Sequence, residues 1–128
     1  MEKRQIIFRV WHNGEMYYRW DKKGEIIIRN GGYVILEMPN GMPLFSGELI
    51  GLDGAVLMQF VGLKDKNYKM IFEGDVMKTY HGNYEVEFES GQFQLKDFDH
   101  YGVNGESPDL EELEIIGNVF ENGELINK

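Results

Sequence analysis

The sequence predicts a mainly β fold, at the margin of the α+β class. We expect a small bent-sheet or barrel domain of short antiparallel strands, with one or two short helices near the C-terminus. Sixteen glycines divide the chain into short apolar segments of strand length. No window of helical length has a convincing apolar period of 3.6 residues. Residues 84–89 alternate between apolar and acidic side chains, as a strand with one buried face does. At 128 residues, the chain is predicted to be a single domain, residues 1–128.

Turn signals give the order of the elements. The expected strands cover residues 4–10, 15–20, 25–29, 33–38, 56–61, 69–72, 76–80, 84–89, 92–96 and 113–120. Asn13-Gly14 predicts a hairpin between the first two strands. Residues 39–54 form a long connection with two prolines and four glycines, holding one short strand or turn near 46–50.

Two short helical segments are expected in the last quarter of the chain. The first begins at Ser107-Pro108, where a capping serine, a proline at the first helical position and acidic residues in the first turn coincide. The second is one helical turn within residues 122–127.

The run GLKDKNYKMIFEGDVMK, residues 62–78, is the most distinctive stretch of the chain. We interpret it as scaffold, with a polar turn at its start and Ile71 and Phe72 in the core. Asn67 is expected to adopt the positive φ of this turn, since Tyr68 would lose about 1–2 kcal/mol there. The alternative is a functional basic loop, in which Lys64, Lys66 and Lys69 bind phosphate or an acidic partner.

Charge is unevenly distributed along the chain. Residues 1–80 contain 11 basic and 10 acidic residues, whereas residues 81–128 contain 2 basic and 12 acidic residues. The net charge of −9 argues against a general nucleic-acid binder. The acidic segment is interpreted either as a solvated surface or as a docking face for a basic partner, including another copy of the chain.

Catalytic and metal-binding patterns find little support. The three histidines, His12, His81 and His100, lack the spacing of metal ligands, and the Asp97–His100 run lacks the glycine and terminal glutamate of a calcium loop. No cysteine is present, and the three serines stand in turn contexts. We therefore expect no enzyme, no cofactor and no metal site. We also expect no membrane span, no signal peptide and a location in the cytoplasm.

The N-terminal aromatic residues carry a second functional hypothesis. Tyr17 and Tyr18 are neighbours on a strand and must point to opposite faces, so one of them is expected to lie at a surface. Together with Arg9 and Arg19, this surface would suit single-stranded nucleic acid or a protein interface. Core packing is the preferred interpretation of Trp11 and Trp20.

Three segments of the chain form a recognisable set: RQIIFRVWHNGEMYY (4–18), LMQFVGLKDKNYKMIFEGDVMK (57–78) and ELEIIGNVFENGELI (112–126). Together they resemble the YopX family of small proteins encoded by bacteriophages and prophages. The resemblance spans the chain, although Tyr68 stands where the family usually has glycine, Gly123 where proline is common and His12 where an acidic residue is usual. It implies a mainly β fold, a phage or prophage origin and no assigned catalytic residues.

The expected function is that of a non-enzymatic phage accessory protein, located in the cytoplasm of the bacterial host, that binds protein or assembles with itself. The alternative is nucleic-acid binding through the N-terminal arginines and aromatics, and a third hypothesis is an enzyme with unrecognised acid–base residues. The candidate interaction surface comprises Arg9, Tyr17, Tyr18, Arg19, Lys64, Lys66, Lys69, Glu85, Glu87, Glu89, Glu111 and Glu112. The acidic members are expected to face basic patches of a second copy around Arg4, Lys22-Lys23 or residues 64–69.

Overall fold

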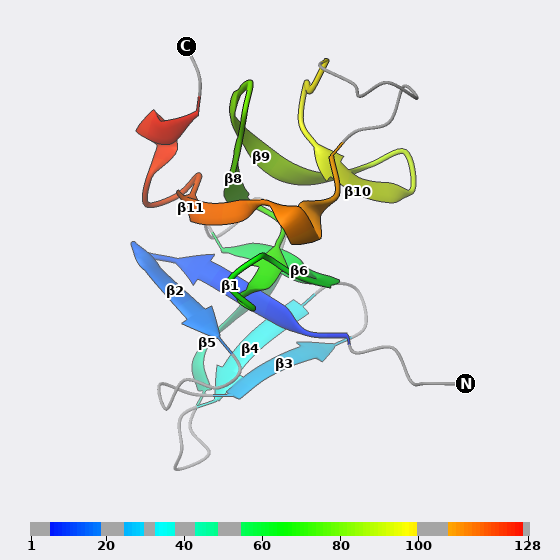
Figure 1. Cartoon of the computed structure of the whole chain (residues 1–128). Helices are drawn as coiled ribbons and strands as arrows, with labels where there is room; N and C mark the ends of the chain where they lie inside the picture. Colours follow the sequence, from blue (N-terminus) through cyan, green and yellow to red (C-terminus); the bar gives the residue numbers. More distant parts are fainter. Residues whose placement is uncertain are drawn as a thin grey trace, which may run out of the picture. The chain divides into compact units, whose positions relative to one another are not determined.

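A computed structural model describes residues 6–18, 25–29, 33–37, 43–48, 55–99 and 108–126 of the chain. In these ranges the regular elements are antiparallel strands and two short 3₁₀ turns, which confirms the mainly β class (Figure 1). In chain order the elements are β1 (Phe8–His12), β2 (Glu15–Tyr18), β3 (Glu25–Arg29), β4 (Tyr33–Glu37), β5 (Pro43–Glu48), β6 (Val56–Lys64), β7 (Met70–Phe72), β8 (Asp75–Thr79), β9 (Gly82–Glu89), β10 (Gln92–Leu95), η1 (Leu110–Glu112), β11 (Glu114–Asn118) and η2 (Gly123–Leu125).

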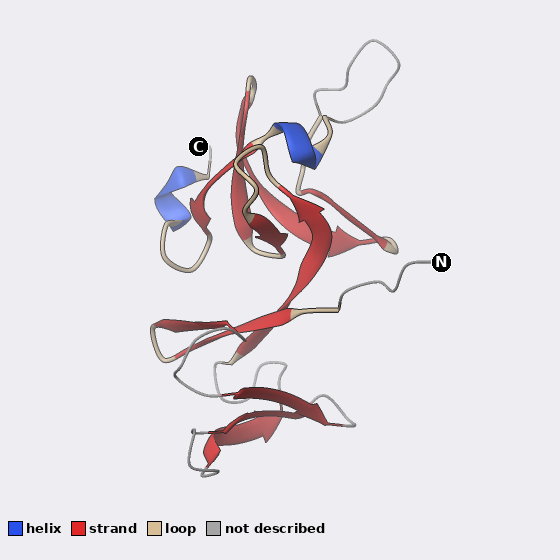
Figure 2. Ribbon diagram, turned by 60° about the horizontal axis from the view of Figure 1, so that its bottom comes forward, coloured by secondary structure: helices blue, strands red, loops and turns tan. Residues whose placement is uncertain are grey.

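The chain divides into two compact units, with the boundary inside β6. The N-terminal unit is Ile6–Gln59, and the C-terminal unit contains Phe60–Lys128. The strands of both units are drawn in red in Figure 2, and β6 pairs with β1 in the N-terminal unit and with β7 in the C-terminal unit.

In the N-terminal unit, β1 and β2 form the expected hairpin. Asn13 and Gly14 form its turn with φ angles of 49° and 79°, a conformation that these two residue types tolerate well. The start of β6 pairs with the other edge of β1, and β3, β4 and β5 form a separate three-stranded sheet. β5 lies at an edge of that sheet, where the proline that begins it is tolerated.

The C-terminal unit contains a four-stranded sheet in the order β10-β9-β8-β11 and the β6–β7 pair. One core cluster joins its elements. Its buried members are Ile71, Met77, Val86, Leu95, Phe98 and Leu110. The expected burial of Ile71 and Phe72 is confirmed, since both side chains are almost fully buried.

Several expected boundaries need correction. The first strand runs over Phe8–His12 instead of 4–10, because it continues up to the Asn-Gly turn. β6 extends three residues past the expected end, because β7 pairs with it as far as Lys64. In the connection 39–54, the strand begins at Pro43, earlier than expected.

The expected C-terminal helices are each a single 3₁₀ turn. η1 begins after Asp109, whose side chain makes no capping hydrogen bond. Ser107, the expected cap, lies outside the described residues, as do residues 19–24 and His100.

The strand at 84–89 has the expected alternation, but Phe88 is not buried. Its side chain is 53% exposed, while Val86 on the same face is fully buried. Phe88 stands opposite Phe93 beside the Ser90-Gly91 turn, and the two rings pack edge to face with centroids 5.0 Å apart. The pair therefore lies at the end of the hairpin, beyond the core cluster that covers Val86 and Leu95.

Candidate functional site

The turn between β6 and β7 is organised by one buried carboxylate. Asp65 Oδ1 accepts hydrogen bonds from the backbone N–H groups of Asn67 and Lys69 at 2.8 and 2.9 Å. Its Oδ2 accepts a bond from the N–H of Ile115 at 3.0 Å, 50 residues further along the chain. Burial alone would raise the pKa of Asp65. The three backbone bonds and the charge of Lys69 outweigh it and hold this pKa below its ordinary value.

Tyr68 adopts the positive φ of this turn, at 64°. The expectation that Asn67 adopts it is wrong. The reason lies in the bonds around Asp65. The Asn67 N–H points to the Asp65 carboxylate, and the Tyr68 N–H donates to the Asp65 carbonyl oxygen at 2.9 Å. The chain reverses at Tyr68 so that the next N–H, of Lys69, reaches the same carboxylate. The Tyr68 side chain is 84% exposed.

At the turn after β7, a second buried carboxylate accepts a backbone hydrogen bond. Asp75 is buried and its Oδ2 accepts the N–H of Phe72 at 2.8 Å. Gly74 adopts a φ of 87°, which permits the sharp bend into β8. The run Phe72–Val76 is therefore structural in this fold.

Hydrogen bonds from backbone N–H groups to asparagine side chains hold the turn at the end of β11. The Asn118 side-chain oxygen accepts bonds from the N–H groups of Phe120 and Glu121, and the Asn122 oxygen accepts the N–H of Asn118. Asn122 packs on Gly117 so closely that a Cβ added at Gly117 would lie 2.6 Å from its Oδ1. The glycine and both asparagines are thus required by the backbone geometry.

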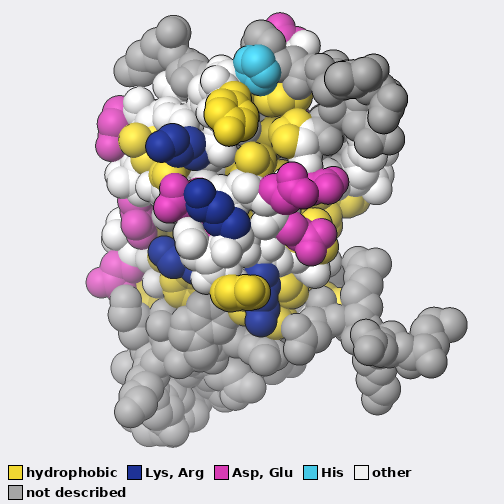
Figure 3. All heavy atoms as spheres, in the orientation of Figure 1, with side chains coloured by type: hydrophobic (Ala, Val, Ile, Leu, Met, Phe, Trp, Pro, Cys, Tyr) yellow, Lys and Arg dark blue, Asp and Glu magenta, His cyan; other side chains and the backbone are white. Residues whose placement is uncertain are grey.

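The three lysines of the β6–β7 turn, Lys64, Lys66 and Lys69, are all exposed. Lys66 and Lys78 line a hollow of about 240 Å³ together with Glu112 and Glu114. Basic and acidic side chains are therefore neighbours there, and Figure 3 shows dark-blue and magenta side chains on the same face. Glu112 belongs to the surroundings of Lys66 instead of forming a separate acidic face with residues 85–89. Glu111 is exposed on η1.

A second hollow, of about 480 Å³, follows the edge strand β10 and the residues after it. Its lining includes the acidic residues Glu87, Glu89 and Asp97 and the basic residue Lys96. Gln94 donates a hydrogen bond to Glu87 across the β9–β10 pair at 3.2 Å. Burial raises the pKa of Glu85; the charge of Lys96 opposes this shift and that of Glu87 adds to it.

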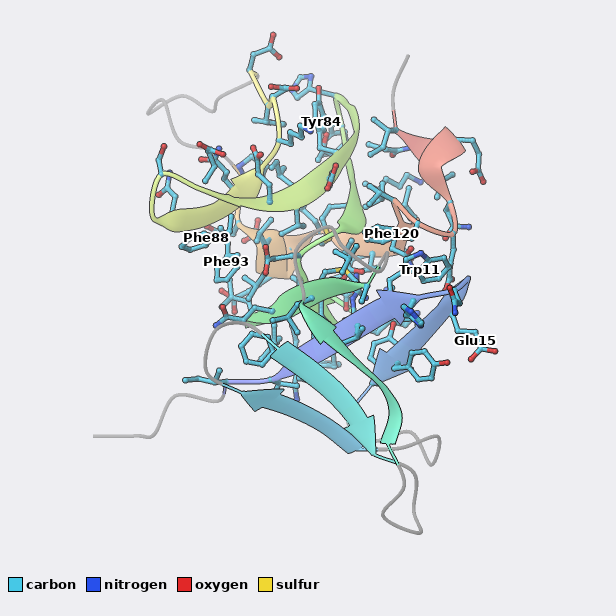
Figure 4. All side chains as sticks on the ribbon, turned by 180° about the vertical axis from the view of Figure 1, so that it is seen from behind. Trp11, Glu15, Tyr84, Phe88, Phe93 and Phe120 are labelled. Carbon is cyan, nitrogen blue, oxygen red and sulfur yellow. The ribbon has the colours of Figure 1, made fainter. Side chains whose placement is uncertain are left out.

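The N-terminal arginine and aromatics do not form an exposed platform. Arg9 is only 2% exposed and Tyr17 is buried, so the expected accessible surface is wrong for these two residues. Arg9 Nη1 donates to the Tyr18 hydroxyl at 3.3 Å, and its guanidinium lies 5.8 Å from the centre of that ring. Burial raises the pKa of Tyr17, and its hydrogen bond to Glu15 raises it further. Trp11 is half-buried, and Figure 4 shows it and Glu15 at the β1–β2 hairpin.

The candidate residues therefore fall into groups that the structure does not bring together. Arg9, Tyr17 and Tyr18 belong to the packed N-terminal hairpin, the lysines to the β6–β7 turn, and Glu85, Glu87 and Glu89 to β9. Arg19, Trp20, Arg4 and Lys22-Lys23 lie outside the described residues. Sequence reasoning missed Phe93 as a lining residue and Asp65 as the centre of the turn. Tyr68 stands where the family usually has glycine, and this departure was the sign in the sequence that the turn is unusual.

Among the described residues, no three His, Asp or Glu side chains are grouped as metal ligands. No helix in the described part of the chain is long and apolar enough to cross a membrane.

Comparison with known proteins shows the family to which the chain belongs. Residues 7–127 match the family model described as YopX protein. The protein yopX from Bacillus subtilis is similar in structure, with a TM-score of 0.66 and 25% identity over 94% of this chain and 98% of that one. The crystal structure of protein EF1440 from Enterococcus faecalis is also similar, with a TM-score of 0.60 and 27% identity over 98% of this chain and 100% of that one. No curated protein sequence matches. The chain therefore belongs to the YopX family.

Proposed function

We propose that this protein is a non-enzymatic accessory protein of phage or prophage origin that acts in the bacterial cytoplasm by binding protein, in the first place another copy of itself. The observation that carries the proposal is the presence of two oppositely charged surfaces on the C-terminal unit. The exposed turn with Lys64 and Lys69 is one, and the acidic hollow along β10 with Glu87 and Glu89 is the other.

These charges are available for contacts with another molecule. Lys64, Lys69 and Glu89 are exposed, and Glu87 is half-buried and accepts a hydrogen bond from Gln94. Lys69 also interacts electrostatically with Asp65. Surfaces of opposite sign on one unit are complementary between copies related head to tail, and contacts of this kind build rings or filaments.

The buried polar residues of the segments that resemble the family have structural roles. The buried atoms of Asp65, Asp75 and Asn118 hold turns together. The exposed side chains around the first of these turns make few contacts of their own, so they are the part of the segment that can meet a partner.

The proposal is tested by the molar mass of the protein as a function of salt. Sedimentation velocity is measured at about 10 mM and about 1 M salt, where charges are screened over about 30 Å and about 3 Å respectively. We expect species heavier than the 14.9 kDa monomer at low salt and a shift toward the monomer at high salt. A monomer under both conditions would contradict self-assembly.

A further inference from the structure

Strand β10 (Gln92–Leu95) is an edge strand among the described elements, and it lacks the usual protection of such a strand. Edge strands of soluble proteins commonly carry charged side chains, proline or a β-bulge, which prevent pairing with another chain. The four residues of β10 are uncharged, none is proline, and their register with β9 is regular. Residues 92–98 all line the hollow along β10, so the strand borders open space. A further strand can therefore be added at β10.

The backbone groups of Phe93 point away from β9. The Lys96 N–H donates to the Glu85 carbonyl oxygen at 2.8 Å, which makes these two residues a hydrogen-bonded pair. Hydrogen-bonded and non-hydrogen-bonded pairs alternate along an antiparallel ladder, so Phe93 and Phe88 form a non-hydrogen-bonded pair. The N–H and C=O of Phe93 consequently lie on the outer side of β10, where no other described strand stands beside it.

The two faces of the β9–β10 hairpin differ in character. By the register, Phe88 and Phe93 share one face, where their rings pack edge to face, and Figure 4 shows them together at the hairpin. Gln92 and Gln94 lie on the other face, which is also the face of the β9 glutamates. The Gln92 amide donates to Gln94, and the Gln94 amide donates to Glu87, at 3.1 and 3.2 Å. Each amide has donors and lone pairs for further bonds, so β10 is apolar on one face and polar but neutral on the other.

We propose that β10 of one copy pairs antiparallel with β10 of a second copy, centred on Phe93. In this register the two Phe93 residues form a hydrogen-bonded pair, and Gln92 of each copy lies opposite Gln94 of the other. The Phe93 rings meet on one face and the glutamine amides meet on the other. No charged side chain stands opposite another across this strand pair, and the nearest glutamates of the two copies are three strand spacings apart, about 14 Å.

This inference rests on the proposed self-assembly and adds a second contact to it. A pair of four-residue strands is too small to hold two copies together alone, since stable interfaces bury about 1,200–2,000 Å². The charge contact builds head-to-tail chains of copies, and many β10 pairs then act together between two such chains. Loss of the charge contact therefore leaves monomers, whereas loss of the β10 contact weakens an assembly that still forms.

The test compares two substitutions that both remove the Phe93 ring. Phe93→Thr keeps the backbone N–H and the preference for a strand, whereas Phe93→Pro also removes the N–H. Neither removes a hydrogen bond of the β9–β10 ladder, because this N–H points away from β9. The proline variant loses both backbone bonds of the central pair, so its dissociation constant of self-association at low salt should be at least about tenfold higher than that of the threonine variant. Circular dichroism checks that both variants are folded.

A cross-link tests the register without a proline. The chain has no cysteine, so Gln92→Cys and Gln94→Cys each carry a single thiol. In the proposed pair, the Cα atoms of residue 92 in one copy and residue 94 in the other lie about 4.5 Å apart, within the reach of a disulfide. The Cα atoms of residue 92 in the two copies lie about 8 Å apart, beyond that reach. Oxidation at low salt should be at least about tenfold faster in the mixture than in either variant alone.

The outcomes separate this contact from the proposed function. Native protein that stays monomeric at low salt overturns both. Native protein that assembles overturns the β10 contact alone if Phe93→Pro and Phe93→Thr associate equally, or if the mixed thiol variants are oxidised no faster than each variant by itself. Both differences together support the pairing of β10 with β10.

Discussion

Replacing the buried Asp65 is expected to destabilise the C-terminal unit more than replacing any exposed acidic residue of that unit. Asp65→Ala deletes three hydrogen bonds of 2.8 to 3.0 Å from backbone N–H groups. Bonds to a charged acceptor contribute about 1.5–3 kcal/mol each, and the cost of burying this carboxylate offsets part of that, which leaves about 1–1.5 kcal/mol per bond. The three together predict a loss of about 3–4 kcal/mol in the free energy of unfolding.

The assay is equilibrium unfolding in urea, followed by circular dichroism, because both tryptophans fall within residues 6–59 and not in the C-terminal unit. In thermal unfolding the same loss corresponds to a decrease of roughly 10–15 °C in the melting temperature for a domain of this size. Asp65→Asn keeps one acceptor oxygen but places an amide N–H₂ opposite a backbone donor, so about half of the loss is expected.

Asp109→Ala is the matched control. Its carboxylate is exposed and caps nothing, so its effect should stay within about 0.5 kcal/mol. A loss below about 1 kcal/mol for Asp65→Ala would refute the view that this carboxylate organises the turn and connects it to β11.

Further predictions concern the same turns. The folded-state pKa of Asp65 lies below its unfolded value of about 3.9. Its ionised form therefore stabilises the fold fully above that pH, and this stabilisation is lost as the pH falls through the folded-state pKa. The check is to compare the acid unfolding of wild type with that of Asp65→Asn. Gly117→Ala should cost about 2–3 kcal/mol, measured by urea unfolding, because its Cβ collides with Asn122. Tyr68→Gly should stabilise the monomer by about 1 kcal/mol in the same assay, since glycine adopts a positive φ without strain.

Local signals in the sequence predicted the features that depend on few neighbours. Asn13-Gly14 and Ser90-Gly91 determine their hairpins through the positive φ that each of these residues adopts. The mainly β class followed from glycine spacing and strand-length apolar segments.

Features that depend on distant contacts were not predictable. The bond between Asp65 and the N–H of Ile115 spans 50 residues, and no local pattern in the sequence indicates it. Phe88 has the pattern of a buried residue, yet the core cluster ends before it. Arg9 has the character of a surface residue, but in the folded hairpin it is buried and packs on Tyr18.

Charge exchange tests the central claim, that copies of this protein bind each other through surfaces of opposite sign. One variant carries Lys64→Glu and Lys69→Glu, and the other carries Glu87→Lys and Glu89→Lys. Each alone presents like charges at the contact and should remain monomeric at low salt, with circular dichroism confirming the fold. Light scattering of their equimolar mixture should show assemblies again, because opposite charges then meet between copies. Assembly of either variant alone to the extent of the native protein, or a mixture that stays monomeric, would contradict the account.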